Sequence, residues 1–456
     1  MMRSGSGQLT ELVKKTVSCL TGERFMMGYV LSCMILVPLT ELIFQLMGFM
    51  FFGSAYVITI YGVIGVFIGF INLYYSKERH WSDFFFITLN IFLVFSLIFS
   101  CDLTIFIEGT PDFIERPEYI IAYYCLMLVS FRISSVRNRK ILLGCIVGIS
   151  LFQACVAVPQ TFGYKILEAP YGATSYEVYG LTQNDCFYGG LSTLFVGCCS
   201  GIFILCEKKL YRLIAVVSLL IAVYCSVNTM ARLAWVGDIS ILLFFVISIL
   251  IMRKRNPLDS KYNSYLNRYI LTIITCLAGV LLAILNPNER PLLYDRFFRT
   301  SRELSEGDFG NGRGNIWYYC LSSVPDHWLT GIGLSNIPQC FTENPNWHEG
   351  DYITNFAHNI YIHILATQGV FAFINYMVFL VISTVKAVRK ILFTDDKTEQ
   401  ILTWIFLAMF TGYAVSAFFN CRICYVEMYF YIIIGLMDPI IAPGSKTADI
   451  RKAEVK

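Results

Sequence analysis

Long apolar stretches recur along the whole chain, and polar connections separate them. Roughly 20 apolar residues cross the hydrocarbon core of a bilayer as an α-helix. Because lipid offers the backbone no hydrogen-bond partners, each stretch is expected to be helical. The pattern predicts twelve membrane-spanning helices, of which 118–131 and 213–227 are shorter than this length. They lie near 25–50, 54–75, 82–100, 118–131, 141–158, 186–206, 213–227, 233–252, 269–285, 368–388, 401–419 and 427–443.

Composition supports an all-α polytopic membrane protein. Hydrophobic residues make up 56% of the 456 residues, charged residues 15% and aromatic residues 16%. Soluble domains are more charged and less apolar, so composition excludes a soluble enzyme, a disordered chain and a small disulfide scaffold. A net charge of +3 is too small to indicate a nucleic-acid partner.

The basic residues predict the orientation. If the N-terminus is cytoplasmic, 26 of the 35 Lys and Arg residues fall on the cytoplasmic side of the twelve helices. Cytoplasmic connections are enriched in Lys and Arg, and here the enrichment recurs at each of them. The first apolar stretch is long and lacks a small-residue cleavage site, so it is interpreted as a span and not as a cleaved signal peptide. We therefore expect a multi-pass protein with both termini cytoplasmic.

The predicted organisation has four parts. Residues 1–285 hold helices one to nine, and residues 286–357 form one large extracytoplasmic loop. Residues 358–443 hold a re-entrant segment and helices ten to twelve, and 444–456 form a cytoplasmic tail. A loop of this length is usually functional. Glu41, Asp238 and Glu427 are acidic residues within apolar stretches, where they are candidates for a polar pathway.

The large loop has an unusual charge pattern. It contains five arginines and no lysine, together with nine acidic residues, and four of the five histidines of the chain fall between 327 and 363. Arginine grips phosphate oxygens with a planar fork, and histidine transfers protons near neutral pH. The alternative is an ordinary solvated loop in which the arginines pair with nearby acids.

Two motifs of this region combine such groups with helix starts. Arg313-x3-Trp317 opens a predicted helix, and a proline and the turn Gly331-x-Gly333 follow. His358-Asn359 begins the helix that returns to the membrane. The N-terminus of a helix favours anions. A cap of the returning helix is the alternative role for His358.

These motifs, with a glycine at 369 and the twelve-helix layout, resemble the O-antigen ligase and O-antigen polymerase superfamily. Members of the family often carry a Ser-Arg pair at the position of VNTMARLAWVG. This chain keeps the arginine, Arg232, and has Ala231 in place of the serine. Asn184 in GLTQNDCFYGG matches the family's asparagine-containing segment. Simple snorkelling to the interface is the alternative role for Arg232.

The resemblance implies a GT-C-like membrane glycosyltransferase of the bacterial cytoplasmic (inner) membrane. Its donor would be an undecaprenyl-pyrophosphate-linked oligosaccharide, with membrane lipid around the prenyl tail, and its product an O-antigen or capsular polysaccharide. A flippase and a chain-length regulator are candidate partners. The sequence has no compact acidic cluster of the Asp-x-Asp kind. We therefore predict a reaction that needs no metal and no cofactor.

On this reading Arg232 and Arg313 bind the pyrophosphate, and His358 takes a proton from the acceptor hydroxyl. Displacement at the anomeric carbon in one step inverts its configuration. The predicted substrate-binding residues are Arg302, Arg299, Asn359, Trp317 and Asn184.

Three other functions compete with a polymerase. A ligase would hand the same glycan to a lipid or other acceptor. A flippase for lipid-linked oligosaccharides should show two related halves, and no repeat is evident here. A cell-wall polymerase of the peptidoglycan type would depend on an aspartate of an outer loop.

Overall fold

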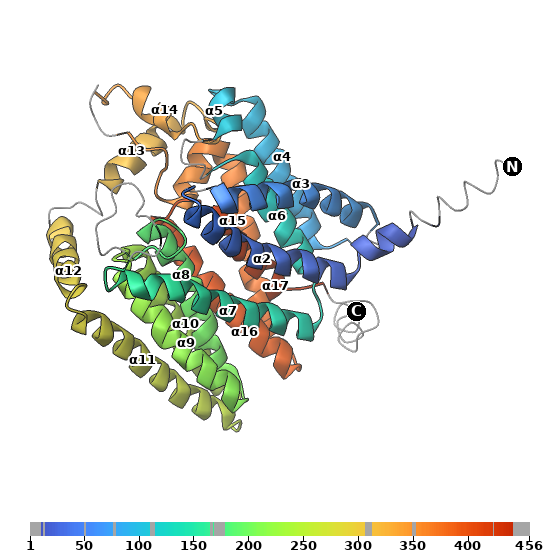
Figure 1. Ribbon diagram of the computed structural model, residues 1–456. Helices are drawn as coiled ribbons and strands as arrows, with labels where there is room; N and C mark the ends of the chain where they lie inside the picture. Colours follow the sequence, from blue (N-terminus) through green and yellow to red (C-terminus); the bar gives the residue numbers. More distant parts are fainter. Residues whose placement is uncertain are drawn as a thin grey trace.

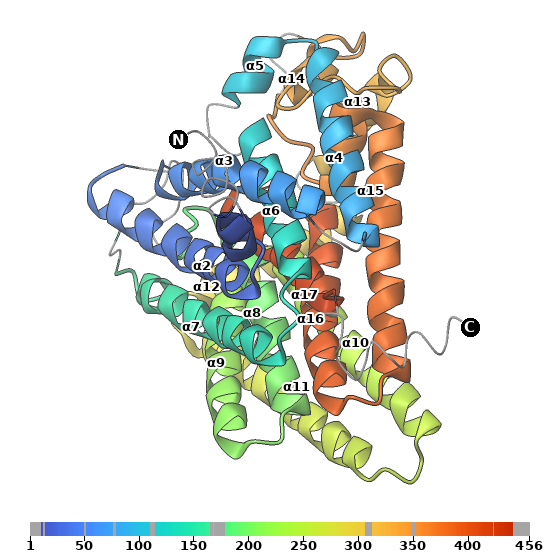
Figure 2. The ribbon, with the colours of Figure 1, turned by 90° about the vertical axis from the view of Figure 1, so that its right-hand side faces the viewer.

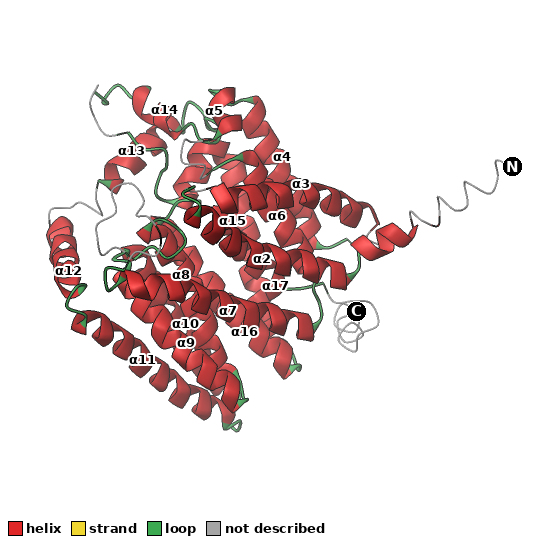
Figure 3. Cartoon of the chain, in the orientation of Figure 1, coloured by secondary structure: helices red, strands yellow, loops and turns green. Residues whose placement is uncertain are grey.

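The computed structural model describes residues 11, 14–49, 52–75, 79–109, 115–164, 167, 178–305, 312–348, 353–422 and 424–440. Within these ranges all regular structure is helical (Figures 1 and 3). The helices are α2 (Glu23–Leu46), α3 (Phe52–Tyr75), α4 (Trp81–Ile98), α5 (Leu103–Glu108), α6 (Pro117–Phe131), α7 (Val136–Gln160), α8 (Asp185–Leu205), α9 (Lys209–Asn228), α10 (Arg232–Arg255), α11 (Lys261–Leu285), α12 (Arg290–Ser305), α13 (Arg313–Ser323), α14 (Ile337–Thr342), α15 (Ile360–Phe393), α16 (Lys397–Ser416), η1 (Ala417–Phe419) and α17 (Cys424–Met437).

A helix lies at each of the twelve predicted positions, which confirms the polytopic all-α class. In the described chain, ten helices are long and apolar enough to cross a membrane. The stretch at 213–227 belongs to α9, which has 20 residues and is one of the ten. The stretch at 118–131 stays short, because α6 has 15 residues. The last helix, α17, ends at Met437, before the predicted limit of 443.

The two shorter apolar helices lie inside the bundle. In α6 the residues from Ala122 to Phe131 are all buried, and α17 is buried from Val426 to Met437. A helix that is apolar all round is stable when other helices surround it. The long helices α10 and α11 instead expose most of their apolar surface, as helices that face lipid do. The sequence marked these segments as apolar but gave no sign of which were central.

The large loop, residues 286–357, contains the three helices α12, α13 and α14. The turn after α13 packs directly against α15 through backbone hydrogen bonds. Ile332 N donates to Ala366 O at 3.0 Å, and Val370 N donates to Trp328 O at 2.8 Å. Figure 2 shows α13, α14 and α5 at the same end of the bundle, which is called the loop end below.

Two glycines make this close packing possible. Gly331 has φ +69°, and a Cβ there would lie 2.2 Å from the backbone carbon of Thr367. Gly369 has φ +84° and breaks the helical geometry inside α15, and a Cβ there would lie 2.6 Å from Leu329 O. Only glycine fits such positions without strain. The predicted helix at 368–388 is therefore part of the longer α15, which begins at Ile360.

Candidate functional site

Four helices that carry predicted site residues begin at the loop end. They are α8, α10, α13 and α15, which start at Asp185, Arg232, Arg313 and Ile360. The starts of α8 and α10 are in close contact, because a Cβ at Gly189 would lie 2.9 Å from Ala231 Cβ. Each helix start adds partial positive charge from its free N–H groups.

Arg232 and Arg296 form the first part of the site. Arg232 Nη2 lies 2.7 Å from Glu303 Oε2, so α12 supplies the partner of a residue on α10. Arg296, also on α12, donates from Nε to Met230 O at 3.0 Å. Burial and then the like charge of Arg232 lower the pKa of Arg296, so the two guanidinium groups are close enough to repel each other. An anion between them would relieve that repulsion.

Arg313 forms the second part. Its Nη1 donates to Phe419 O at 3.1 Å, which fixes the guanidinium against the connection between α16 and α17. Phe419 in turn packs against Ala231, Leu233 and Ala234, the buried residues on either side of Arg232. Arg232, Arg296 and Arg313 are therefore linked through near neighbours. We call these three residues the arginine cluster.

His358 lies beside Arg313. Its Nδ1 is 3.3 Å from Cys421 Sγ, and its Nε2 is 3.5 Å from Thr354 Oγ1. Burial lowers the pKa of His358 to about 4, and the charge of Arg313 adds to this effect. The imidazole is therefore neutral at physiological pH and able to accept a proton. Its backbone has φ +48°, a conformation that is rare for residues other than glycine.

This low pKa predicts the pH dependence of turnover. A step that needs neutral His358 should keep its rate down to about pH 5 and lose it as the pH approaches about 4. The folded protein binds this proton less readily than the unfolded chain, so the contribution of His358 to stability is present above pH 6.5 and is lost as the pH falls towards about 4. The prediction about turnover is tested by measuring kcat against pH with the purified protein. An inflection near pH 6.5 would show an ordinary histidine.

Three predicted substrate-binding residues form hydrogen bonds with main-chain groups around the site. Trp317 Nε1 donates to Ala357 O at 2.9 Å, directly before His358. Asn359 caps α15 by accepting from Tyr361 N and Ile362 N. Asn184 caps α8 by accepting from Phe187 N at 3.2 Å. Substrate binding by these side chains remains a prediction.

The remaining two predicted residues lie on α12. Arg302 is exposed in the last turn of this helix. Arg299 is exposed and pairs with Asp295 at 3.3 Å, within the same helix. This is the ordinary solvated ion pair that was the alternative for each loop arginine. Arg296, one turn before Arg299, occupies the site instead.

A buried ionic group that was not predicted from the sequence lies next to the site. His363 Nε2 lies 2.7 Å from Glu115 Oε2, and Arg422 Nη1 lies 3.9 Å from Glu115 Oε1. Burial alone raises the pKa of Glu115, but His363 and Arg422 hold the pKa below its ordinary value. Ser335 donates to the same residue through its backbone N and its Oγ. Glu115 thus joins the start of α6, the large loop, α15 and the α16–α17 connection.

Replacing Glu115 by glutamine should destabilise the fold. The change weakens the buried hydrogen bond to His363 and leaves Arg422 without its buried counter-charge, and we expect the free energy of unfolding to fall by about 2 kcal/mol. The measurement is unfolding by SDS in mixed micelles. Asp295→Asn is the matched control, because its exposed ion pair should change stability by less than about 0.5 kcal/mol. Equal effects of the two changes would contradict the anchoring role of Glu115.

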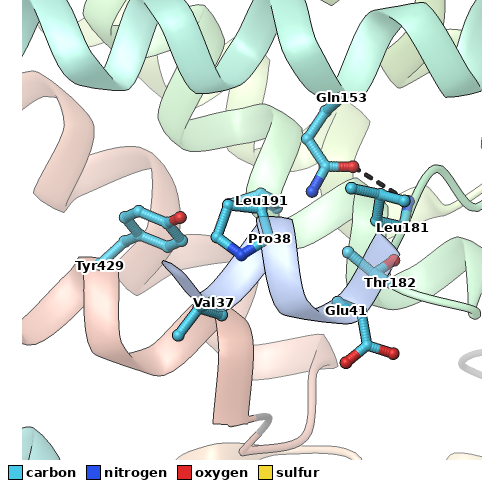
Figure 4. Close-up of a pocket in the computed structure, with 8 residues that line it drawn as sticks. All are labelled: Val37, Pro38, Glu41, Gln153, Leu181, Thr182, Leu191 and Tyr429. Atoms are coloured by element: carbon cyan, nitrogen blue, oxygen red, sulfur yellow. Dashed lines mark hydrogen bonds between the residues drawn. The ribbon is translucent and has the colours of Figure 1, made fainter. Parts of the chain in front are cut away.

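The acidic residues within the membrane helices have separate partners. Asp238 accepts from Ser226 Oγ at 2.7 Å, and Glu427 accepts from Tyr413 OH at 2.9 Å. Glu41 accepts from Gln45 Nε2 at 2.9 Å and from Ser54 N at 2.8 Å. Glu41 also borders a pocket between α2, α7, α8 and α17 (Figure 4), lined by Val37, Pro38, Glu41, Gln153, Leu181, Thr182, Leu191 and Tyr429. None of the residues that line this pocket belongs to the arginine cluster.

The fold and the loop-end site define a multi-pass membrane protein with a cationic site beside a neutral histidine. Residues 190–377 match the model of a family described as O-antigen ligase. This part of the chain is therefore similar to that family, which agrees with the resemblance seen in the sequence. Arg232, Arg296, Arg313 and His358 all lie within the match, and Asn184 lies just before it. No curated protein matches the chain. The family implies a transferase of the glycan ligase or polymerase type.

Proposed function

We propose that the protein is a glycan polymerase that joins undecaprenyl-pyrophosphate-linked oligosaccharide repeat units into an O-antigen or capsular polysaccharide. The loop end would face the outside of the bacterial cytoplasmic membrane. The observation that carries the proposal is the arginine cluster beside neutral His358, within the part of the chain that matches the family. The donor joins a lipid tail to a pyrophosphate and a sugar chain. Apolar helices, clustered guanidinium groups and a polar loop suit these three parts in turn.

The proposed chemistry divides between the two parts of the site. As the bond between the anomeric carbon and the pyrophosphate breaks, negative charge grows on the leaving oxygen. Arg232, Arg296 and Arg313 stabilise this charge. The ion pair of Arg232 and the hydrogen bonds of the other two arginines hold them in place before the reaction. His358 accepts the proton of the acceptor hydroxyl as that oxygen attacks from the opposite side. One displacement inverts the anomeric configuration.

An O-antigen ligase is the second candidate, because the matching family is described by that name. Polymerase and ligase would share donor, site and chemistry, and would differ only in the acceptor. A flippase is less well supported, since the charged groups of the site gather at one end of the bundle and do not line its interior. The acceptor is therefore the property to test.

The deciding experiment supplies the protein, in lipid nanodiscs, with one lipid-linked repeat unit as sole substrate. A polymerase should give a ladder of longer lipid-linked chains. A ligase should give no ladder and should add the unit to lipid A–core oligosaccharide when this acceptor is supplied. Absence of product in both assays, with transport of the donor across vesicles, would favour a flippase.

The same assay tests whether the transfer needs a metal. Because arginines stabilise the leaving group in this proposal, transfer should proceed in excess EDTA at close to its normal rate. The measurement compares initial rates with and without the chelator. A loss of transfer that Mg²⁺ restores would contradict an arginine-based mechanism.

A further inference from the structure

We propose that Cys101, His327 and Glu343 form a binding site for one zinc ion that ties the large loop to the end of α4. No metal site was predicted from the sequence, because it has no compact acidic cluster of the Asp-x-Asp kind, and these three residues lie far apart along the chain. The proposal does not rest on the function proposed above.

The geometry of the three groups supports the site. Cys101 Sγ, a His327 ring nitrogen and a Glu343 carboxylate oxygen all lie within 4.8 Å of one another. His327 Nε2 and Glu343 Oε2 are 3.5 Å apart. Bonds of about 2.0–2.3 Å in a tetrahedral zinc site place ligand atoms roughly 3.3–3.8 Å apart. The pair of His327 and Glu343 already meets this spacing, and small side-chain rotations would bring in Cys101.

The backbone holds these ligands in place from three different segments. Cys101, after α4, donates from its N to Ile332 O at 3.0 Å. His327, in the turn after α13, donates from its N to Val324 O at 3.2 Å. Glu343 follows α14 and donates from its N to Gln339 O at 3.0 Å. The bond from Cys101 to Ile332 therefore fixes the end of α4 beside the large loop, and the other two bonds fix the local backbone at His327 and Glu343.

The chemical types of the three ligands favour zinc over other divalent ions. One thiolate, one imidazole and one carboxylate suit zinc, whereas calcium and magnesium prefer oxygen ligands only. The thiolate and the carboxylate together balance the charge of a divalent cation. Cys101 and Glu343 are exposed and His327 is half-buried, so a water molecule can reach a fourth position.

The position of the site indicates a structural role. Helix α13 begins at Arg313 and has 11 residues, which corresponds to roughly 16 Å of helix, and His327 follows its end. A metal at His327 is therefore too far from Arg313 to take part in chemistry at the arginine cluster. A buried group that includes Ile316, Cys320, Cys340 and Phe341 already packs α13 against α14. The metal would join this unit to the end of α4.

Metal content and a cobalt titration test the proposal. Protein purified in detergent without chelator should retain about one zinc ion per chain, as measured by inductively coupled plasma mass spectrometry. After removal of the zinc, titration with Co²⁺ should give a thiolate-to-cobalt charge-transfer band. Cys101→Ser should abolish this band, and His327→Gln should weaken cobalt affinity more than about tenfold.

Two variants are matched controls. His348→Gln alters another exposed histidine of the large loop, and Cys19→Ser alters another exposed cysteine. Both should retain the zinc and the full cobalt affinity. The absence of a charge-transfer band, a band that survives Cys101→Ser, or a disulfide at Cys101 would each overturn the site. None of these measurements involves glycan transfer, so their failure would leave the proposed function untouched.

Discussion

Replacing Arg313 by lysine should reduce glycan transfer about 100- to 1,000-fold, the usual effect of removing one donor that stabilises a developing oxyanion. The side chain is oriented by its hydrogen bond to Phe419 O, so its remaining nitrogens point in fixed directions. Lysine keeps the positive charge but has no planar fork and cannot hold both this carbonyl and a phosphate oxygen. We expect the loss mainly in kcat, because the charge on the leaving group is largest in the transition state.

Arg290→Lys is the matched control for this change. Arg290 begins α12 on the same loop, and its side chain is exposed. Its replacement should leave transfer within about twofold of the wild-type rate, since an exposed charge away from the reacting groups contributes little. The measurement is the initial rate of chain growth in nanodiscs. A wild-type distribution of polymer lengths with Arg313→Lys would remove this residue from the mechanism.

Replacing His358 by alanine should slow turnover about 100- to 10,000-fold and change donor affinity much less. The reason is its position, since a neutral imidazole beside Arg313 can accept a proton but adds no charge to hold the pyrophosphate. Single-turnover kinetics separate the two quantities, with donor binding measured directly. Equal losses in both would make His358 a binding or capping residue.

Backbone strain could confuse this result, because His358 has φ +48°. Asparagine tolerates this conformation better than alanine does, so His358→Asn separates strain from chemistry. Both variants should be equally inactive if proton transfer is what is lost. His348→Ala is the control for the loss of a loop histidine and should retain activity. Recovery of turnover with asparagine would assign the defect of the alanine variant to the backbone.

Periodicity and composition predicted the helices well, because a bilayer imposes one length and one kind of backbone structure on each crossing segment. They could not predict which helices are central. The short α6 and α17 are stable because neighbours surround them, and burial of this kind is a property of packing that the local sequence does not record. The break at Gly369 inside α15 was missed for a similar reason, since it depends on contact with the turn at Gly331.

Some residues of the candidate site could be selected from the sequence, and others could not. Arg313 and His358 stood out because motifs around helix starts identify them, and the structure places them side by side. Arg296 was not separated from Arg299 and Arg302, because the side of α12 that faces Met230 follows from how this helix packs. Glu115 and Arg422 gave no signal at all. Each stands in a short connection, and only the folded chain brings them to His363.

The hydrogen bond from Arg313 to Phe419 and the contact between His358 and Cys421 have a practical consequence. Both partners come after residue 377, where the recognised O-antigen ligase segment stops, and Glu115 comes long before it begins. A fragment cut at the limits of that segment would keep its arginines yet lose the surroundings that orient them. Excision or chimera designs should therefore carry the chain from Glu115 through Arg422 as one piece.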